Sequence, residues 1–306
     1  MGWEQSMAQM LITGGTGFVG DALIPACIER GHQLTVLTRD PDRARKRHGA
    51  MAESIQYIKD IGAIETQPEM VVNLAGLGIA DARWTDARKR ALRSSRVHLT
   101  EQLVAHLATL PGAPAVVVSG SAVGYYGPKT EGVFRETDAP GWDFAARLCS
   151  DWEAAIMPLD GPETGVYRLR IGVVLGRPGG FLGRLEWPFR LGLGGPLGRG
   201  QQMLSWIHRD DLVRLILACL EGQLPPGAYN ATAPNPVSNA VFTKALGRVL
   251  KRPTIFRVPE APMRLVLGEL ASLLFEGQAV VPEAAMAGGF QFRHPDLDAA
   301  LGDLFR

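Results

Sequence analysis

The sequence lacks several features that would mark a specialised class of protein. Its 306 residues include only three cysteines: Cys27, Cys149 and Cys219. This small, odd set fits a reducing, cytoplasmic setting better than a disulfide framework. No two cysteines or histidines stand close enough in sequence to suggest metal ligands, so no metal is expected.

An imbalance of charge and a long apolar run are also absent. The chain has 32 Lys and Arg against 31 Asp and Glu, a net charge of +1. No electrostatic footprint therefore predicts a nucleic-acid or membrane partner. No apolar run reaches the roughly 18 residues of a membrane span, and the N-terminus lacks the pattern of a signal peptide. The remaining composition, 46% hydrophobic and 21% charged, is that of an ordinary globular protein.

The most informative stretch is Leu11-Ile-Thr-Gly-Gly-Thr-Gly-Phe-Val-Gly20. A short apolar run ends there, three glycines follow, and residues 21–30 have apolar positions at helical spacing. Gly14 permits a sharp turn, Gly17 lets a pyrophosphate approach the backbone, and Gly20 lets the helix pack closely. The helix N-terminus then offers unpaired N–H groups to phosphates. This strand–turn–helix context predicts dinucleotide binding.

The rest of the chain alternates apolar runs with helical patterns, which predicts an α/β sheet. The strands expected after the first lie at 34–38, 55–58, 70–74, 115–119, 166–175 and about 229–232. The helices expected after the first lie at 94–110, 143–156, 206–220, 240–250, 261–274 and 297–304. Asp210 and Asp211 are the N-cap candidates of the helix that ends near 220. Residues 176–200, rich in glycine and proline, predict a loop-rich cap.

Thr38 ends the second strand and Arg39 follows it, where this architecture places the adenosine ribose. An acidic residue there suits the ribose 2′-hydroxyl, whereas an arginine suits a 2′-phosphate. Arg39 therefore favours NADP(H), with NAD(H) as the alternative because Asp40 is adjacent. A solvated arginine that merely opens the basic run to Arg47 is the other interpretation.

Two later segments also reach the predicted cofactor edge. Leu74 ends the fourth strand and Ala75 and Gly76 follow it; small residues there let the backbone lie beside a cofactor. Arg96, near the start of the next helix, is placed to reach a phosphate; an exposed helix cation is the alternative. Ser121 and Tyr125 follow the fifth strand, where open α/β sheets hold their ligands.

Taken together, these motifs resemble the extended short-chain dehydrogenase/reductase superfamily. The matching pieces are Gly14-Gly-Thr-Gly-Phe-Val-Gly20, Asn73-Leu-Ala-Gly76, Ser121-Ala-Val-Gly-Tyr-Tyr-Gly127, Arg170-Ile-Gly-Val-Val-Leu-Gly176 and Trp206-Ile-His-Arg-Asp-Asp211. Other pieces, among them Trp152-Glu153 and Phe189-Arg-Leu-Gly-Leu-Gly-Gly-Pro196, are similar to an atypical NAD-dependent epimerase/dehydratase branch whose C-terminal module has no known role.

The resemblance implies a doubly wound parallel sheet, a Rossmann fold, with a smaller C-terminal substrate lobe. The NADP(H)-binding core would span 8–176, with 204–232 returning to it, and the lobe 177–203 and 233–306. It implies cofactor contacts across the glycine motif, including Thr16, Phe18 and Val19. A homodimer through helices of the core is left open as an alternative to a monomer.

One departure from the superfamily concerns its acid/base pair, Tyr-x-x-x-Lys, in which the lysine favours the tyrosinate. Aligned on Glu153, these positions hold Ala145 and Cys149, and no lysine occurs between positions 129 and 244. Ser121 matches the serine that binds the substrate carbonyl. Tyr125 or Tyr126 is a candidate replacement for the tyrosine; packing beneath the cap is the alternative role.

Two functions remain open from the sequence. The first is an NADP(H)-dependent oxidoreductase or epimerase acting on a small carbonyl or hydroxyl substrate, with a nucleotide sugar as one option. Ser121 and Tyr125 would be its catalytic residues. The second is a catalytically silent NADP(H)-binding protein that senses redox state or recruits a partner. The missing Tyr–Lys pair motivates the second.

Overall fold

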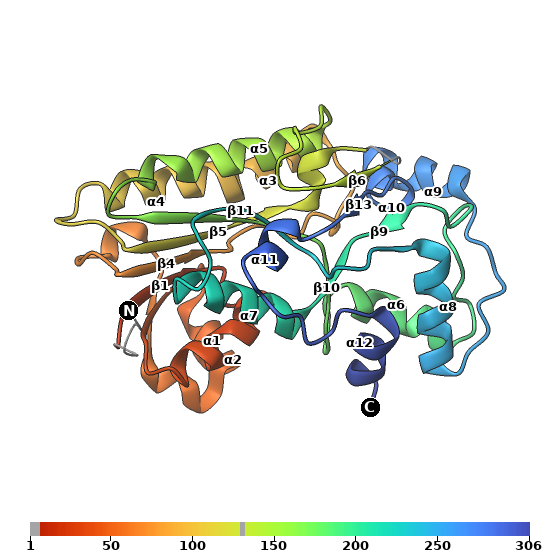
Figure 1. Cartoon of the computed structure of the whole chain (residues 1–306), viewed down its shortest axis with the longest axis horizontal. Coiled ribbons are helices and arrows are strands. Elements are labelled where there is room, and N and C mark those ends of the chain that lie inside the picture. Colours follow the sequence, from red (N-terminus) through yellow and green to blue (C-terminus); the bar gives the residue numbers. More distant parts are fainter. Residues whose placement is uncertain (1–6, 129–131) are drawn as a thin grey trace.

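The computed structural model describes residues 7–128 and 132–306 and is built on a seven-stranded sheet (Figure 1). All its neighbouring strands pair in parallel, in the order β11-β7-β5-β4-β1-β2-β3. The strands are β1 (Gln9–Thr13), β2 (Gln33–Leu37), β3 (Ile55–Ile58), β4 (Met70–Asn73), β5 (Val116–Ala122), β7 (Gly165–Ile171) and β11 (Gly227–Ala231). Strand order reverses between β1 and β4, which opens a crevice at their carboxyl ends. The doubly wound parallel fold is confirmed.

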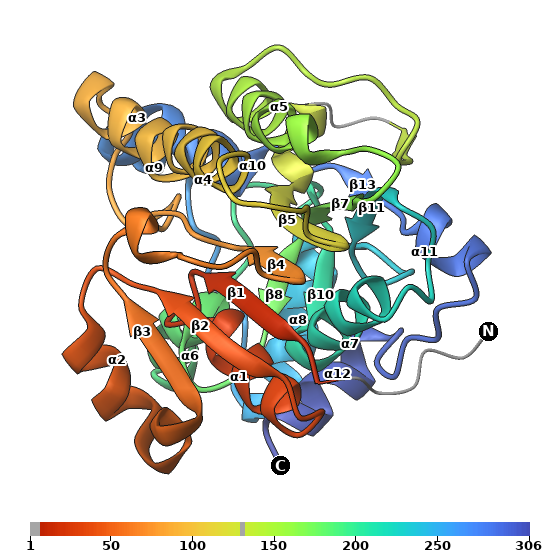
Figure 2. The same cartoon turned by 90° about the vertical axis from the view of Figure 1, so that its left-hand side faces the viewer.

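Helices cover both faces of this sheet (Figure 2). One face carries α1 (Gly20–Ile28), α2 (Pro41–His48) and α7 (Arg209–Leu220). The other carries α3 (Asp86–Arg93), α4 (Leu99–Leu107) and α5 (Phe144–Ile156). Because both faces are covered, the inner strands are buried along their length, as their β-branched runs predict.

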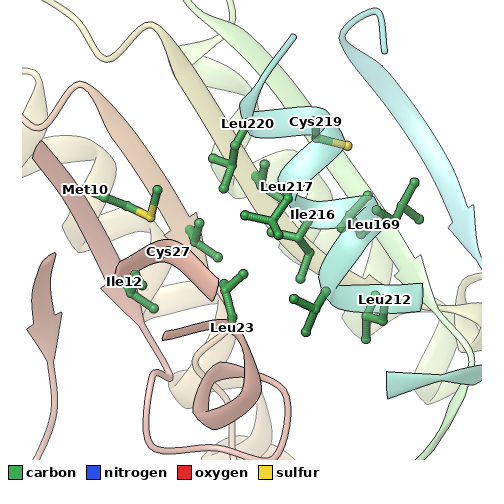
Figure 3. Packing of buried hydrophobic residues seen from close by; sticks show 14 of the residues in the cluster. Met10, Ile12, Leu23, Cys27, Leu169, Leu212, Ile216, Leu217, Cys219 and Leu220 are labelled. Carbon is green, nitrogen blue, oxygen red and sulfur yellow. The ribbon is translucent and has the colours of Figure 1, made fainter. Parts of the chain in front are cut away.

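The largest apolar core lies beneath β1, β4 and β7. Figure 3 shows Leu23 and Cys27 of α1 facing Leu212, Ile216 and Leu220 of α7 across it. These side chains are at most 3% exposed. The packing fixes α1 against the sheet and so fixes the direction in which its N-terminus points.

A second apolar core belongs to the C-terminal part of the chain. It joins α6 (Gly180–Arg190), α8 (Asn239–Leu250) and α12 (Leu297–Leu304). Two two-stranded sheets contribute to it: β8 (Val173–Leu175) with β10 (Trp206–His208), and β9 (Met203–Leu204) with β12 (Val237–Ser238). A third, β6 (Val133–Phe134) with β13 (Ala279–Val280), belongs to a small separate cluster with Tyr126. The remaining helices are α9 (Glu260–Leu267), α10 (Ser272–Phe275) and α11 (Glu283–Ala287). The residue limits predicted for the two domains stay a prediction.

Four predictions about local structure are wrong. The strand expected at 166–175 breaks at Gly172, because the backbone changes its hydrogen-bond partner there: the Gly172 N–H donates to the Ala231 carbonyl of β11, but the Val173 N–H donates to the Ser205 carbonyl. From this point β8 pairs outside the main sheet. The expected loop at 176–200 contains α6. The helix expected from 206 begins after β10, and His208 is its N-cap, not Asp210 or Asp211.

The helix expected at 261–274 is the fourth error, since Gly268 ends α9 at a φ of 60°. A 3₁₀ turn and α10 follow. No helix among the described residues is long and apolar enough to cross a membrane.

Candidate active site

The turn between β1 and α1 is built from glycines that touch backbone. Gly14 has a φ of 73°, and a Cβ there would lie 2.6 Å from the Leu74 carbonyl carbon. A Cβ on Gly20 would lie 2.4 Å from the Gly14 carbonyl oxygen and 2.6 Å from the Gly15 Cα. Both positions therefore exclude any side chain, and the turn, the helix and the end of β4 are held together.

Gly17 differs from its two neighbours, because a Cβ there would meet only the Gly14 carbonyl oxygen, at 3.1 Å. The backbone N–H groups of Phe18 and Val19, at the start of α1, donate to no acceptor in the described part of the chain. Open donors at a helix N-terminus, beside a glycine with a free face, fit a pyrophosphate. The residues present therefore fit the dinucleotide that the motif predicts.

Arg39 lies just beyond β2 and is exposed. It forms no ion pair within residues 7–128 and 132–306. Asp40 is already engaged, since its carboxylate caps α2 by accepting the Arg43 N–H at 3.0 Å. The Thr38 hydroxyl accepts a hydrogen bond from the Asp40 N–H at 3.4 Å. The free group at this position is thus a cation and not a carboxylate.

Arg96 is packed against the predicted cofactor edge. It lies on a π-helical turn, Ser94–His98, between α3 and α4, and donates to the Leu77 carbonyl at 2.8 Å. Its guanidinium fills the space that a Cβ on Gly76 would need, at 2.8 Å. Burial lowers the pKa of Arg96 from its usual value. The exposed helix cation considered for this position is therefore wrong; a contact with a phosphate stays a prediction.

A buried polar network holds the ends of β1, β4 and β5 together. Thr13 donates to the Asn73 side-chain oxygen at 2.8 Å, and the Ala75 N–H donates to Thr13 at 3.2 Å. The Asn73 amide in turn donates to Thr100 and Ser119, at 2.8 and 3.2 Å. This network sets the course of Leu74–Gly76 past the glycine turn.

Ser121 is not on a loop beyond the strand as the sequence suggested. It lies within β5, is 3% exposed, and donates its hydroxyl to Glu153 at 2.7 Å. Glu153 also accepts from Arg170 Nε and Nη2, at 2.9 and 3.1 Å. Arg170 itself lies in β7 and is 3% exposed. Glu153 and Arg170 thus form a buried ion pair with two hydrogen bonds, and the Ser121 hydroxyl donates a third to the same carboxylate.

The two tyrosines after β5 differ in their surroundings. Tyr126 is fully buried; it donates to the Asn230 side chain at 2.6 Å and accepts from Arg170 at 3.0 Å. Burial raises its pKa to about 12. Tyr125 is half-buried, and the Arg170 guanidinium carbon lies 3.5 Å from the centre of its ring. Tyr126 is thus a structural residue, whereas the contacts of Tyr125 with the described residues are made by its ring.

Cys149 and Ala145 lie on α5 where the superfamily pattern has its acid/base pair. Both are buried, and burial raises the pKa of the Cys149 thiol to about 12. A neutral thiol replaces the lysine's cation. Among the described residues, a cation reaches the Tyr125 ring instead from β7, through Arg170.

Sequence reasoning gave no role to Arg170 or Glu153. One signal was available: a charged residue inside the apolar run 166–175 requires a buried partner. The identity of that partner required the fold, because Glu153 lies on α5.

The C-terminal lobe closes on the glycine turn through Phe18. A Cβ on Gly180, at the start of α6, would lie 2.7 Å from the Phe18 ring, and Arg209 lies 5.0 Å from the centre of the same ring. On the far side, Arg184 of α6 pairs with Asp81, in the segment after β4. The C-terminal lobe therefore contacts the turn at the Phe18 side chain and leaves the open face of Gly17 free.

His208, His294 and Asp303 place one potential ligand atom each within 4.8 Å of one another. Spacing in the sequence gives no hint of this group. The Nδ1 atom of His208 accepts the Asp210 N–H at 3.1 Å, so its proton lies on Nε2, 3.7 Å from Asp303. In this tautomer His208 presents an N–H and not a metal ligand to the group.

Fold and site together define a doubly wound α/β protein with a dinucleotide crevice. The model of the NAD dependent epimerase/dehydratase family matches residues 10–232, and a domain of unknown function matches residues 258–304. The chain belongs to the NAD dependent epimerase/dehydratase family.

Named relatives agree with this family. A chloroplastic SDR39U1 homologue of the epimerase family, from Arabidopsis thaliana, is 38% identical over 97% of this chain and 87% of its own length. The crystal structure of the human epimerase family protein SDR39U1 with NADPH has a TM-score of 0.88 and 35% identity, covering 97% of this chain and 99% of that one. A nucleoside-diphosphate sugar epimerase from Corynebacterium glutamicum has a TM-score of 0.77 and 30% identity, over 98% of this chain and 59% of that one.

Proposed function

We propose that this protein is an NADP(H)-dependent oxidoreductase or epimerase that acts on a small carbonyl or hydroxyl substrate. The observation that carries the proposal is the pairing of an open glycine turn with an unpaired Arg39, while Asp40 is used as a helix cap. An arginine with no carboxylate partner is the group expected to recognise a 2′-phosphate. The human relative crystallised with NADPH supports the same cofactor.

The bound cofactor would supply a hydride acceptor or donor at its nicotinamide ring. The turn at Gly14–Gly20 would hold the pyrophosphate against the Phe18 and Val19 N–H groups. Arg39 would hold the adenosine end, and the backbone of Leu74–Gly76 would line the crevice beside it. Arg96, which packs over Gly76, would add a positive charge at that edge.

Tyr125 is the proposed proton carrier. Tyr126 is excluded because both of its hydroxyl hydrogen bonds are internal. The Tyr125 hydroxyl makes no hydrogen bond to the described residues, so it is available to a substrate. The Arg170 cation against its ring would stabilise negative charge that develops on the phenol oxygen during proton transfer.

Ser121 is proposed to bind the substrate oxygen, in a more restricted way than the sequence implied. Its proton is donated to Glu153, so its lone pairs are the part left for a ligand. In this state Ser121 accepts a hydrogen bond from a substrate hydroxyl. To donate to a carbonyl it would first have to release Glu153. The arrangement therefore favours the alcohol form of the substrate as the one bound first.

The test is turnover followed by nicotinamide absorbance, with NADP⁺ against hydroxyl substrates and NADPH against carbonyls, nucleotide sugars included in the panel. Tyr125→Phe should lower kcat by roughly 10²-fold or more, the usual contribution of a general acid–base group. The matched control is Tyr229→Phe, which alters a tyrosine bonded to the Pro225 carbonyl in a different part of the sheet. Full activity of Tyr125→Phe would remove this mechanism. Tight NADPH binding without turnover of any substrate would leave the silent, redox-sensing alternative.

A further inference from the structure

Exposed apolar side chains gather at one margin of the C-terminal lobe. Trp187 and Leu191, one helical turn apart at the end of α6, are 72% and 65% exposed. Leu193 follows them at 58% exposure. In the connection from α8 to α9, Ile255 is 77% and Phe256 54% exposed. Single exposed apolar residues are ordinary, but a contiguous group marks an interaction surface.

The two segments that carry these side chains run next to each other (Figure 1). The Arg252 guanidinium donates to the Arg190 carbonyl at 2.8 Å, and the Val258 N–H donates to the Pro196 carbonyl at 2.9 Å. Between these contacts, Gly195 lies directly against the Phe256 backbone. Residues 187–193 and 251–257 therefore form one continuous strip, which we call the apolar–basic rim.

The charges of this rim all have one sign. Neither 187–193 nor 251–257 contains an acidic residue. Lys251, Arg252 and Arg257 are exposed, and none of them has a carboxylate partner in the part of the chain that the structure describes. Ile255 and Phe256 thus stand between basic residues on both sides.

A basic groove adjoins the rim along the end of α8. It has a volume of about 560 Å³, and its lining includes Lys244, Arg248, Lys251 and Arg252. Within residues 7–128 and 132–306, only Arg248 of these four pairs with a carboxylate, that of Asp298. The groove therefore offers several cations to an anionic group, directly beside the exposed Ile255 and Phe256.

We propose that the apolar–basic rim is a docking surface for an anionic phospholipid membrane. The apolar side chains would enter the region between headgroups and acyl chains, and the cations would bind lipid phosphates in and around the groove. A membrane suits this surface better than a protein partner, because the rim projects at a margin of the molecule and a fluid bilayer requires no matching shape. The docked protein would keep the C-terminal lobe next to the bilayer.

The absence of a membrane partner was predicted from the net charge and from the lack of a long apolar run. Net charge is a sum over the whole chain, and the search for an apolar run considers one continuous segment. Neither criterion detects the rim, because the rim joins two short segments that are more than fifty residues apart in sequence. A surface of this kind becomes visible only when the fold brings the segments together.

The test is sedimentation of the full chain with vesicles of phosphatidylcholine alone and of phosphatidylcholine mixed with phosphatidylglycerol. We expect binding to the mixed vesicles that weakens with added salt, and little binding to phosphatidylcholine alone. The variants Ile255→Ser/Phe256→Ser and Lys251→Glu/Arg257→Glu should each weaken binding on the order of tenfold or more. Thermal unfolding should be unchanged, because these side chains are exposed.

Two control variants match these changes elsewhere on the surface. Trp142→Ser removes an apolar side chain that is 73% exposed but lies outside the rim, and Arg43→Glu/Lys46→Glu reverses two exposed charges on α2. Both should bind the mixed vesicles as the wild type does. Absence of vesicle binding, or equal loss in the α2 variant, would overturn the proposal. So would a wild-type dimer, detected by analytical ultracentrifugation, that Ile255→Ser/Phe256→Ser converts to a monomer, because the rim would then bind a second copy.

Discussion

The glycine turn after β1 and the buried ion-pair network around Glu153 and Arg170, between β5 and β7, lie at the same edge of the sheet but are built in opposite ways. At the turn, one continuous stretch of ten residues, 11–20, supplies the groups expected to face the pyrophosphate, and these groups are backbone. In the network, Ser121, Glu153, Arg170 and Asn230 come from four separate elements, and its chemistry is that of side chains.

This difference explains why the two regions vary in how far their function can be inferred. A site built from backbone groups needs residues whose side chains do not block the ligand, so its sequence stays close to the glycine motif of the family. A site built from side chains depends on pairs of residues, so replacing one residue changes the role of its partners. Here a neutral Cys149 occupies the lysine's place, and the cation next to the candidate tyrosine comes from β7.

The largest effect is expected in the buried network. Glu153→Gln removes the counter-charge of Arg170, which stays charged at any working pH. A buried cation without its partner lowers the free energy of unfolding by about 3–5 kcal/mol. Urea denaturation measures this change. Glu163→Gln, an exposed glutamate in the turn before β7, is the matched control and should change stability little. A loss below about 1 kcal/mol in Glu153→Gln would show that the network does not hold this part of the fold.

An intermediate effect should separate two glycines of the turn. Gly20→Ala places a methyl group against backbone at 2.4 and 2.6 Å, so it should cost about 1–3 kcal/mol of stability and also abolish NADPH binding. Gly17→Ala meets one carbonyl oxygen at 3.1 Å, so the fold should tolerate it. Its methyl group should nevertheless weaken NADPH binding by roughly ten- to a hundredfold. Thermal unfolding and cofactor titration of both variants give the comparison, and equal effects on stability would contradict it.

The smallest effect concerns pH. Burial lowers the pKa of His208 below its usual 6.5, so the unfolded chain binds more protons than the folded one as the pH falls below about 6.5. The free energy of unfolding should therefore fall as the pH drops from about 7 to about 5. His208→Asn keeps an N-cap acceptor for α7 but does not titrate, so its stability should depend less on pH. Urea denaturation of the wild type and His208→Asn at several pH values measures the two slopes, and equal slopes would contradict the prediction.

Much of the core could be predicted from the sequence, because its signals are local. The run 55–58 is a strand with those bounds, and the N-terminal glycine spacing requires a tight turn whatever surrounds it. The errors arise where contacts with residues distant in sequence determine the local structure. After Gly172 the chain hydrogen-bonds to the Ser205 carbonyl instead of to β11, and α6 is stabilised by packing against α8. The sequence placed Ser121 beyond the fifth strand, whereas it lies within β5 and its hydroxyl donates to the Glu153 carboxylate on α5.

The most direct test of the proposed NADP(H) recognition is calorimetric titration of NADPH and NADH into the wild type, Arg39→Gln and Lys46→Gln. Loss of a charge-assisted hydrogen bond to a phosphate should weaken NADPH binding roughly ten- to a hundredfold in Arg39→Gln and leave NADH unchanged. Lys46→Gln, which removes an equal charge from the exposed face of α2, should bind both as the wild type does. Equal affinity of the wild type for the two cofactors, or no loss in Arg39→Gln, would contradict the account.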